Sequence, residues 1–234
     1  MVLGGLQRNS FIDFPGRVSC VLFLRGCNFH CPYCHNPELV RGTEGTGEGA
    51  RLAESDVYEF LSERRGFLDG VVISGGEPTL QDELPDLCDR VKGMGFPVKL
   101  DTNGSRPHTL KALINGGMVD YIAMDIKTAP SRYSLIAESG VEAGDILKSV
   151  ELIITSGIAH EFRTTCVSPI VREHDISSIA RLIQGAQMYA LQRFHADKVL
   201  YPDFFRGQGH GYDEGGMLRL KSLAEPWVQK CVVR

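Results

Sequence analysis

The segment VSCVLFL, residues 18–24, is a nearly continuous apolar run of strand length that stands directly before a cysteine-rich loop. Its apolar residues do not alternate with polar ones, which is the pattern of a strand buried on both faces of a parallel sheet. Comparable runs recur along the chain at residues 70–73, 97–100, 121–124, 161–166 and 190–194. We therefore expect residues 18–24 to form the first of six parallel strands.

Helix-like stretches separate these runs. They open on acidic residues, on Ser-Asp or on proline, and several stop at glycine. They cover residues 55–65, 82–94, 107–115, 144–156 and 174–189. Repeated alternation of strand and helix indicates an α/β fold. Because eight such units need about 250 residues, we expect a partial (β/α)6 barrel, similar to an incomplete TIM barrel, with its chemistry at the carboxyl ends of the strands.

Length and charge limit the classes of protein to consider. We expect one domain over residues 1–234, with an N-terminal segment at 1–17 and a C-terminal extension from about residue 203. The net charge of −4 argues against a general nucleic-acid-binding surface. No apolar run reaches the roughly 18 residues that cross a bilayer, and residues 1–10 lack the order of a signal peptide. These features predict a cytoplasmic protein that binds neither nucleic acid nor membrane.

The chain has seven cysteines, an odd number that makes a poor disulfide framework. Three of them, Cys27, Cys31 and Cys34, fall within eight residues. Three thiolates can hold a cubane iron–sulfur cluster by three of its four irons. A zinc site of these cysteines with His30 or His35 is the rival interpretation. The remaining cysteines are expected to be small buried apolar residues, namely Cys20, Cys88, Cys166 and Cys231.

The C-x₃-C-x₂-C spacing, with Tyr33 before the last cysteine, resembles that of the radical S-adenosylmethionine (SAM) superfamily. Its members bind a [4Fe–4S] cluster through those cysteines, and the amino and carboxylate groups of SAM chelate the fourth iron. The resemblance implies that the reduced cluster breaks a C–S bond of SAM to give methionine and a 5′-deoxyadenosyl radical, which abstracts hydrogen. It also implies that Tyr33 packs near the adenine.

A glycine pair and a carboxylate follow the second predicted strand, in the sequence SGGEP at residues 74–78. Gly75 and Gly76 would let a ligand approach the backbone, and Glu77 or neighbouring carbonyls can accept a hydrogen bond from an ammonium group. In the radical SAM superfamily this motif binds the amino group of SAM. We therefore expect these three residues to contact SAM.

Charged residues also stand at the ends of later predicted strands. Asp125 and Lys127 lie on the same side of the chain by alternation, and Arg163 lies inside an apolar run, where an arginine needs a partner. Given the resemblance, these three are predicted to contact the carboxylate and ribose of SAM. The sequence DTNG at residues 101–104, after the third run, is by itself typical of a turn.

The joint order of these motifs is similar to that of glycyl-radical-enzyme activating enzymes, including the activators of pyruvate formate-lyase. Residues 10–16 look like the N-terminal segment of that group. In residues 6–39 and 192–202 the sequence is most similar to that of activating proteins of anaerobic ribonucleoside-triphosphate reductase. Many activators carry further cysteine-rich clusters, but residues 41–50 hold four glycines and no cysteine. We expect a flexible surface segment there and a single cluster.

Two further assignments come from this resemblance alone. In the activator of pyruvate formate-lyase, the residues that correspond to Asp101, Thr102 and Asp125 help to hold a monovalent cation beside SAM, and oxygen ligands suit an alkali ion. The relatives also place a histidine beside the adenine near the last strand, where this chain has His195.

The sequence thus predicts an activase that takes a hydrogen atom from one backbone glycine of a partner glycyl radical enzyme. The preferred partner is anaerobic ribonucleoside-triphosphate reductase, with flavodoxin or ferredoxin as the electron donor. One alternative is a radical SAM enzyme that acts on a small molecule, as in deazapurine biosynthesis, and another is the activator of a different glycyl radical enzyme. A non-enzymatic iron–sulfur carrier or zinc-stabilised domain would leave the strand-end motifs unexplained.

Overall fold

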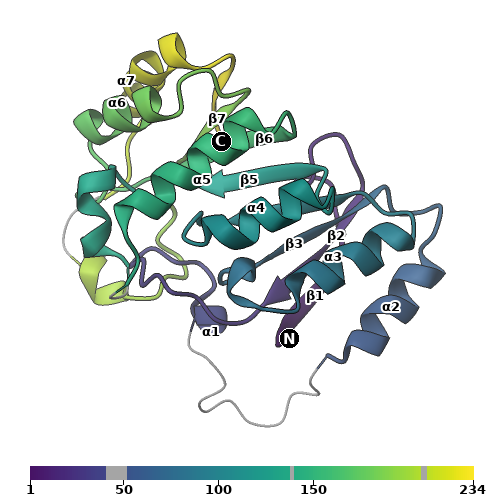
Figure 1. The fold of residues 1–234 in the computed structure, drawn as a ribbon. Coiled ribbons are helices and arrows are strands. Elements are labelled where there is room, and N and C mark those ends of the chain that lie inside the picture. Colours follow the sequence, from purple (N-terminus) through teal and green to yellow (C-terminus); the bar gives the residue numbers. More distant parts are fainter. Residues whose placement is uncertain (41–51, 138–139, 207–209) are drawn as a thin grey trace.

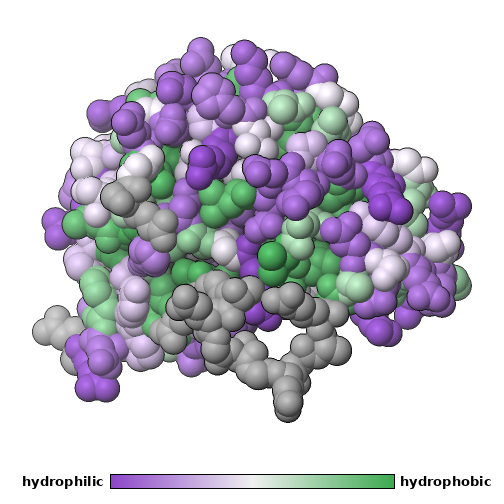
Figure 2. Space-filling model, turned by 60° about the horizontal axis from the view of Figure 1, so that its bottom comes forward, coloured by the Kyte–Doolittle hydropathy of each residue, from purple (hydrophilic) through white to green (hydrophobic). Residues whose placement is uncertain are grey.

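The fold was analysed in a computed structural model that describes residues 1–40, 52–137, 140–206 and 210–234 (Figure 1). The glycine-rich segment predicted to be flexible, residues 41–50, lies outside the described residues. No helix within the described ranges is both long and apolar enough to pass through a bilayer. Hydrophobic and hydrophilic residues are interspersed on the face shown in Figure 2.

The described strands form one sheet in the order β1 to β8. Strand β1 runs antiparallel to β2, and every later neighbour pairs in parallel. The strands are β1 (Leu3–Ser10), β2 (Ser19–Leu24), β3 (Gly70–Gly75), β4 (Val98–Thr102), β5 (Tyr121–Asp125), β6 (Ala159–Cys166), β7 (Tyr189–Arg193) and β8 (Cys231–Val233). Because β1 and β8 stand at opposite ends of this order, the sheet is an incomplete barrel, as predicted.

Six of these strands, β2 to β7, match the six apolar runs of the sequence. The outer strands β1 and β8 were not predicted. Strand β1 reads LGGLQRNS, and its glycines and exposed polar residues carry no apolar signal because the strand pairs on one side only. Strand β8 has only three residues, too few for a recognisable pattern.

Helices follow the parallel strands, and Figure 1 shows α3, α4 and α5 crossing the same face of the sheet. They bury the outward-facing side chains of the strands, such as Leu22, Ile73, Leu100 and Met124. The helices are α1 (Pro37–Val40), α2 (Glu54–Glu63), α3 (Leu84–Gly93), α4 (Pro107–Asn115), α5 (Ala143–Thr155), α6 (Glu173–Leu182) and α7 (Glu214–Ala224). Short 3₁₀ turns lie at η1 (Pro78–Leu80), η2 (Pro130–Leu135), η3 (Pro202–Phe205) and η4 (Glu225–Trp227).

One predicted helix is shorter than expected. Helix α6 ends at Leu182, whereas the sequence predicted helix as far as residue 189. Gly185 has a φ of 87°, which only glycine adopts without strain, and this stops the helix. The buried Tyr189 then begins β7 instead of ending the helix.

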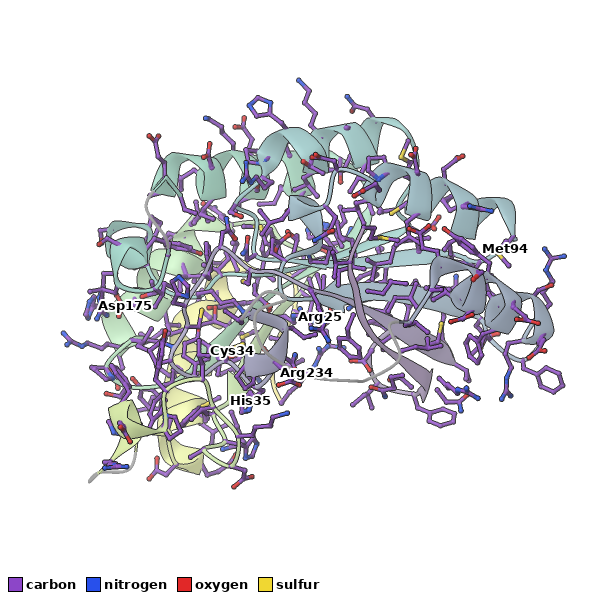
Figure 3. All side chains as sticks on the ribbon, turned by 90° about the horizontal axis from the view of Figure 1, so that it is seen from below. Arg25, Cys34, His35, Met94, Asp175 and Arg234 are labelled. Atoms are coloured by element: carbon purple, nitrogen blue, oxygen red, sulfur yellow. The ribbon has the colours of Figure 1, made fainter. Side chains whose placement is uncertain are left out.

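The register of the sheet gathers the predicted motifs at one edge. Strands β3, β4 and β5 end at Gly75, Thr102 and Asp125, so the motif residues all lie at carboxyl ends. Figure 3 shows Cys34 at this end and Met94, which follows α3, at the opposite end. The strand-end rule therefore brings residues from distant parts of the chain to one place.

An ion pair fastens two loops at this edge. Arg132 in η2 donates to the buried Asp175 of α6 at 2.5 Å, and also to the carbonyls of Pro169 and Ile170 at 2.8 and 3.1 Å. The Asp175 side chain is fully buried, and its second oxygen faces only the exposed His174, at 3.1 Å. The loops after β5 and β6 are thereby held together.

We predict that Arg132→Leu lowers the free energy of unfolding by about 3 kcal/mol, because it leaves the buried Asp175 carboxylate without its main counter-charge. Chemical denaturation of the apoprotein measures this change. The matched control is Arg206→Leu, which removes an ion pair with Asp203 whose partners are 81% and 78% exposed. That variant should unfold like the parent. Equal effects of the two substitutions would contradict the structural role of Arg132.

Candidate active site

A cavity of about 280 Å³ opens at the carboxyl edge of the sheet. Its wall combines the cysteine loop with the ends of β3 to β7. Twelve of the thirteen residues that the sequence analysis assigned to the cluster, SAM or a cation line it: Cys27, Cys31, Tyr33, Cys34, Gly75, Gly76, Glu77, Asp101, Thr102, Asp125, Lys127 and Arg163. Figure 3 shows Cys34 and the adjacent His35 side by side at this end of the molecule.

The three thiols of the loop face the cavity from a mainly buried backbone. Burial raises the pKa of the Cys27 thiol to about 12 and that of Cys31 to about 11. These two ligands are therefore protonated thiols at neutral pH until a metal displaces their protons. The cysteines outside the loop are all buried among apolar residues, as predicted for Cys20, Cys88, Cys166 and Cys231.

The donor set suits a cluster better than a single ion. Within the described ranges, no three His, Cys, Asp or Glu side chains converge closely enough to hold one metal ion. A cubane needs no such convergence, because each thiolate binds a different iron. His35, a candidate zinc ligand, places its Nδ1 3.0 Å from the carbonyl of Lys198. The residues present thus fit a cluster held by Cys27, Cys31 and Cys34.

A chain of buried amides fixes the cysteine loop to the next strand ends. Asn28 donates to Ser105 Oγ at 2.9 Å and accepts from the Asn103 side chain at 3.0 Å. All three side chains are buried. Sequence analysis missed Asn28 and Ser105, although Asn103 stood inside the DTNG motif. These bonds hold the cysteine loop against the DTNG loop.

Glu77 has a structural role that the sequence did not reveal. Its side chain is fully buried and accepts from the amide and hydroxyl of Thr79, the hydroxyl of Thr102 and the amide of Asn103, over 2.5 to 3.1 Å. Burial raises the pKa of Glu77, although these hydrogen bonds favour the ionised form. Its oxygens are thus engaged by the protein, and a contact of Glu77 with SAM stays a prediction.

The glycines before Glu77 serve close contact between two loops. A Cβ on Gly75 would lie 2.2 Å from the Leu24 carbonyl oxygen, and one on Gly76 would lie 2.0 Å from that of Gly26. Gly75 also has a φ of 135°. The pair therefore lets the cysteine loop lie directly against the end of β3.

A network of charges forms the floor of the cavity. Arg163 Nε donates to Asp125 Oδ1 at 2.7 Å, and Lys127 Nζ donates to Asp125 Oδ2 at 3.0 Å. Burial works to raise the pKa of Asp125, but Arg163 and Lys127 outweigh it and hold that pKa well below its usual range. Arg163 also approaches Asp101, at 3.5 Å. The partly buried arginine of the fifth apolar run thus has two carboxylate partners.

Thr102 and His195 are placed differently from the other predicted site residues. Thr102 turns its hydroxyl to Glu77, away from Asp101, by strand alternation. His195 is exposed and does not line the cavity. His35, Thr165 and Gln192 do line it but were not predicted to bind SAM. Thr165 and Gln192 are polar residues inside the fifth and sixth apolar runs and pair across β6 and β7, so only the register shows that both reach the cavity.

Tyr33 is buried beneath the loop after β5. Its hydroxyl lies 3.4 Å from the carbonyl of Lys127, and the residue is 3% exposed. Burial raises its pKa well above the ordinary value. The tyrosine therefore links the cysteine loop to the D-x-K segment as well as lining the cavity, and its place beside adenine stays a prediction.

Comparison with known proteins identifies the family to which the chain belongs. The profile of the Radical SAM superfamily matches residues 21–184, which include the cysteine loop and every strand-end motif. The chain belongs to the radical SAM superfamily. A Methanocaldococcus jannaschii protein with the provisional name glycyl-radical enzyme activating enzyme is 35% identical over 100% of this chain and 95% of its own length.

Two more distant proteins are similar to this chain, one in sequence and one in fold. The pyruvate formate-lyase-activating enzyme of Clostridium pasteurianum is 28% identical over 83% of this chain and 84% of its own length. The crystal structure of QueE from Escherichia coli aligns with a TM-score of 0.55 and 19% identity, covering 98% of this chain and 90% of that one. This radical SAM protein is an activating oxidoreductase of the glycyl-radical type, with a [4Fe–4S] cluster and SAM as cofactors.

We predict that Cys27→Ala, Cys31→Ala and Cys34→Ala each lose the four-iron cluster, since each removes one of its three protein ligands. Anaerobic reconstitution followed by iron and sulfide analysis measures the loss. Cys88→Ala is the matched control, because Cys88 is buried in α3 among apolar side chains. It should keep full iron. Loop variants that retained their iron but lost zinc would refute the assignment.

We also predict that Glu77→Gln lowers the melting temperature of the apoprotein, because an amide nitrogen would face at least one of the donors that now meet a carboxylate oxygen. Thermal unfolding monitored by circular dichroism tests this in the absence of SAM. The control is Glu59→Gln, at an exposed position of α2. An unchanged melting temperature combined with weaker SAM binding would show that Glu77 is a ligand of SAM instead.

Proposed function

We propose that this radical SAM protein abstracts the α-hydrogen from a backbone glycine of anaerobic ribonucleoside-triphosphate reductase. The observation that carries the proposal is the cavity that joins three thiols to the charged ends of β4, β5 and β6. Full-length similarity to a relative named for glycyl-radical activation supports the reaction class. The similarity of residues 6–39 and 192–202 to activators of the reductase supports this partner.

Cys27, Cys31 and Cys34 would hold the cluster, which when reduced would supply one electron to the sulfonium of SAM and break a C–S bond, leaving methionine. The 5′-deoxyadenosyl fragment would take the glycine α-hydrogen, so that 5′-deoxyadenosine and a glycyl radical would be the products. We assign Arg163 and Lys127 to the carboxylate side of SAM because both cations line the cavity and are fixed by Asp125. The carbonyls near Gly75 and Gly76 are assigned to its ammonium group.

Access for a polypeptide is consistent with the sheet. The outer strands β1 and β8 do not pair with each other, so backbone hydrogen bonds do not close the barrel. A partner loop carrying glycine can adopt backbone conformations closed to other residues as it enters. We further propose that flavodoxin or ferredoxin reduces the cluster and that the reaction takes place in the cytoplasm.

We predict that the reduced, reconstituted protein with SAM generates an organic doublet in the electron paramagnetic resonance spectrum of the reductase. One α-hydrogen remains on the radical carbon and splits the signal, so deuterating the glycine α-position should collapse the doublet. Deuterium should also appear in 5′-deoxyadenosine, as measured by mass spectrometry.

The control is the reductase with its radical glycine changed to alanine, which should give no doublet. A doublet formed only on another glycyl radical enzyme would keep the reaction class and replace the partner. Deuterium transfer only from a purine-like small molecule would overturn the activase proposal in favour of a small-molecule enzyme.

A further inference from the structure

A buried lysine lies next to the cavity and was not singled out by the sequence motifs. Lys99 sits in β4 two residues before Asp101, so alternation points both side chains to the inner face of the sheet. Its side chain is 1% exposed and does not line the cavity. Lysine is almost never buried to this degree without a counter-charge.

The partner of this lysine is Asp101. Lys99 Nζ forms a short ion pair with Asp101 Oδ1, and its ammonium lies 5.9 Å from the centre of the Tyr121 ring. Asp101 itself lines the cavity and is 14% exposed. The lysine thus places a fixed positive charge directly behind a carboxylate of the SAM cavity.

The contacts of Asp101 leave little room for a further cation. Oδ1 meets Lys99 and, at 3.5 Å, Arg163, while Oδ2 accepts from Ser74 Oγ at 3.0 Å. The second predicted ligand, Thr102, donates its hydroxyl to Glu77 at 2.8 Å and accepts from the Gly104 amide at 3.1 Å. An alkali ion at this position would have to displace these partners.

The third predicted ligand is engaged in the same way. Asp125 meets Arg163 and Lys127 at 2.7 and 3.0 Å. The connected network therefore contains three cations, Lys99, Lys127 and Arg163, and two carboxylates. The network therefore carries one net positive charge, and all of its charges are on side chains. Of its three cations, Lys99 is the one that does not line the cavity.

We propose that the ammonium of Lys99 is the built-in cation of this site and takes the place of an alkali ion beside Asp101. Lys99 is a positioning residue: it fixes Asp101 and the charge of the floor, and it touches no ligand. SAM binding by this protein is then independent of alkali ions. Removing the ammonium while keeping the length of the side chain opens a position that sodium or potassium can fill.

The test uses Lys99→Met in the reconstituted protein. SAM affinity is measured by anaerobic calorimetry in potassium chloride and in tetramethylammonium chloride at equal ionic strength, and bound cation is detected by thallium(I) NMR. The parent should bind SAM equally in both salts and give no bound-thallium signal. Lys99→Met should bind SAM about tenfold more weakly in the tetramethylammonium salt, recover in potassium, and bind thallium.

Two controls separate this from a general effect of losing a lysine. Lys99→Arg keeps the charge and should stay independent of potassium. Lys92→Met removes an ion pair with Asp120 whose partners are 31% and 38% exposed, and it should create no potassium dependence. A parent protein that needs potassium to bind SAM would overturn the proposal, as would a folded Lys99→Met variant indifferent to potassium. Should Lys99→Met fail to fold, the salt dependence of the parent and of Lys99→Arg still decides.

Discussion

Four hydrogen bonds converge on the carboxylate of Glu77, and the packing of the cysteine loop against the ends of β3 and β4 depends on them. The bonds fix the turn after β3 and the DTNG loop after β4 to one buried group. Asn103, whose backbone amide donates to Glu77, also donates a side-chain hydrogen bond to Asn28 in the cysteine loop. Gly75 and Gly76 allow the same loop to lie against β3. Three segments separated by up to 77 residues thereby share one rigid support.

The ion pairs at the floor of the cavity stabilise the site in addition to these hydrogen bonds. Asp125 is held ionised by Arg163 and Lys127, so the ion pairs contribute stability that is fully present above the ordinary aspartate pKa of about 3.9 and is lost as the pH falls below it. Because the network lies at strand ends, its geometry is set by the register of β4, β5 and β6. A parallel sheet is a suitable base, since its ladder fixes neighbouring side chains at a regular spacing.

Much of this arrangement could be predicted from the sequence, because the strand runs are apolar and the motifs stand immediately after them. Cys27, Gly75 and Asp125 could be placed at one edge by the rule for parallel strands alone. Lys99 and Asn28 could not, since a buried lysine or amide is recognised only by a partner distant in sequence. The N-terminal strand was missed because its stability comes from pairing with β2 and not from its own residues. The prediction for His195 relied on relative position, and the loop after β7 leaves that residue exposed.

The burial of the cysteine loop also has a consequence for the protein before it carries iron. Thiolates, and not thiols, attack disulfides and alkylating agents. Since burial keeps the pKa of Cys27 and Cys31 near 12 and 11, only a minute fraction of either sulfur is nucleophilic at neutral pH. Cys27 and Cys31 are thus expected to react slowly with oxidants and electrophiles before iron binds. Their sulfurs become strong ligands when iron arrives to take the place of the protons, so reactivity is conferred by the metal that the loop is built to receive.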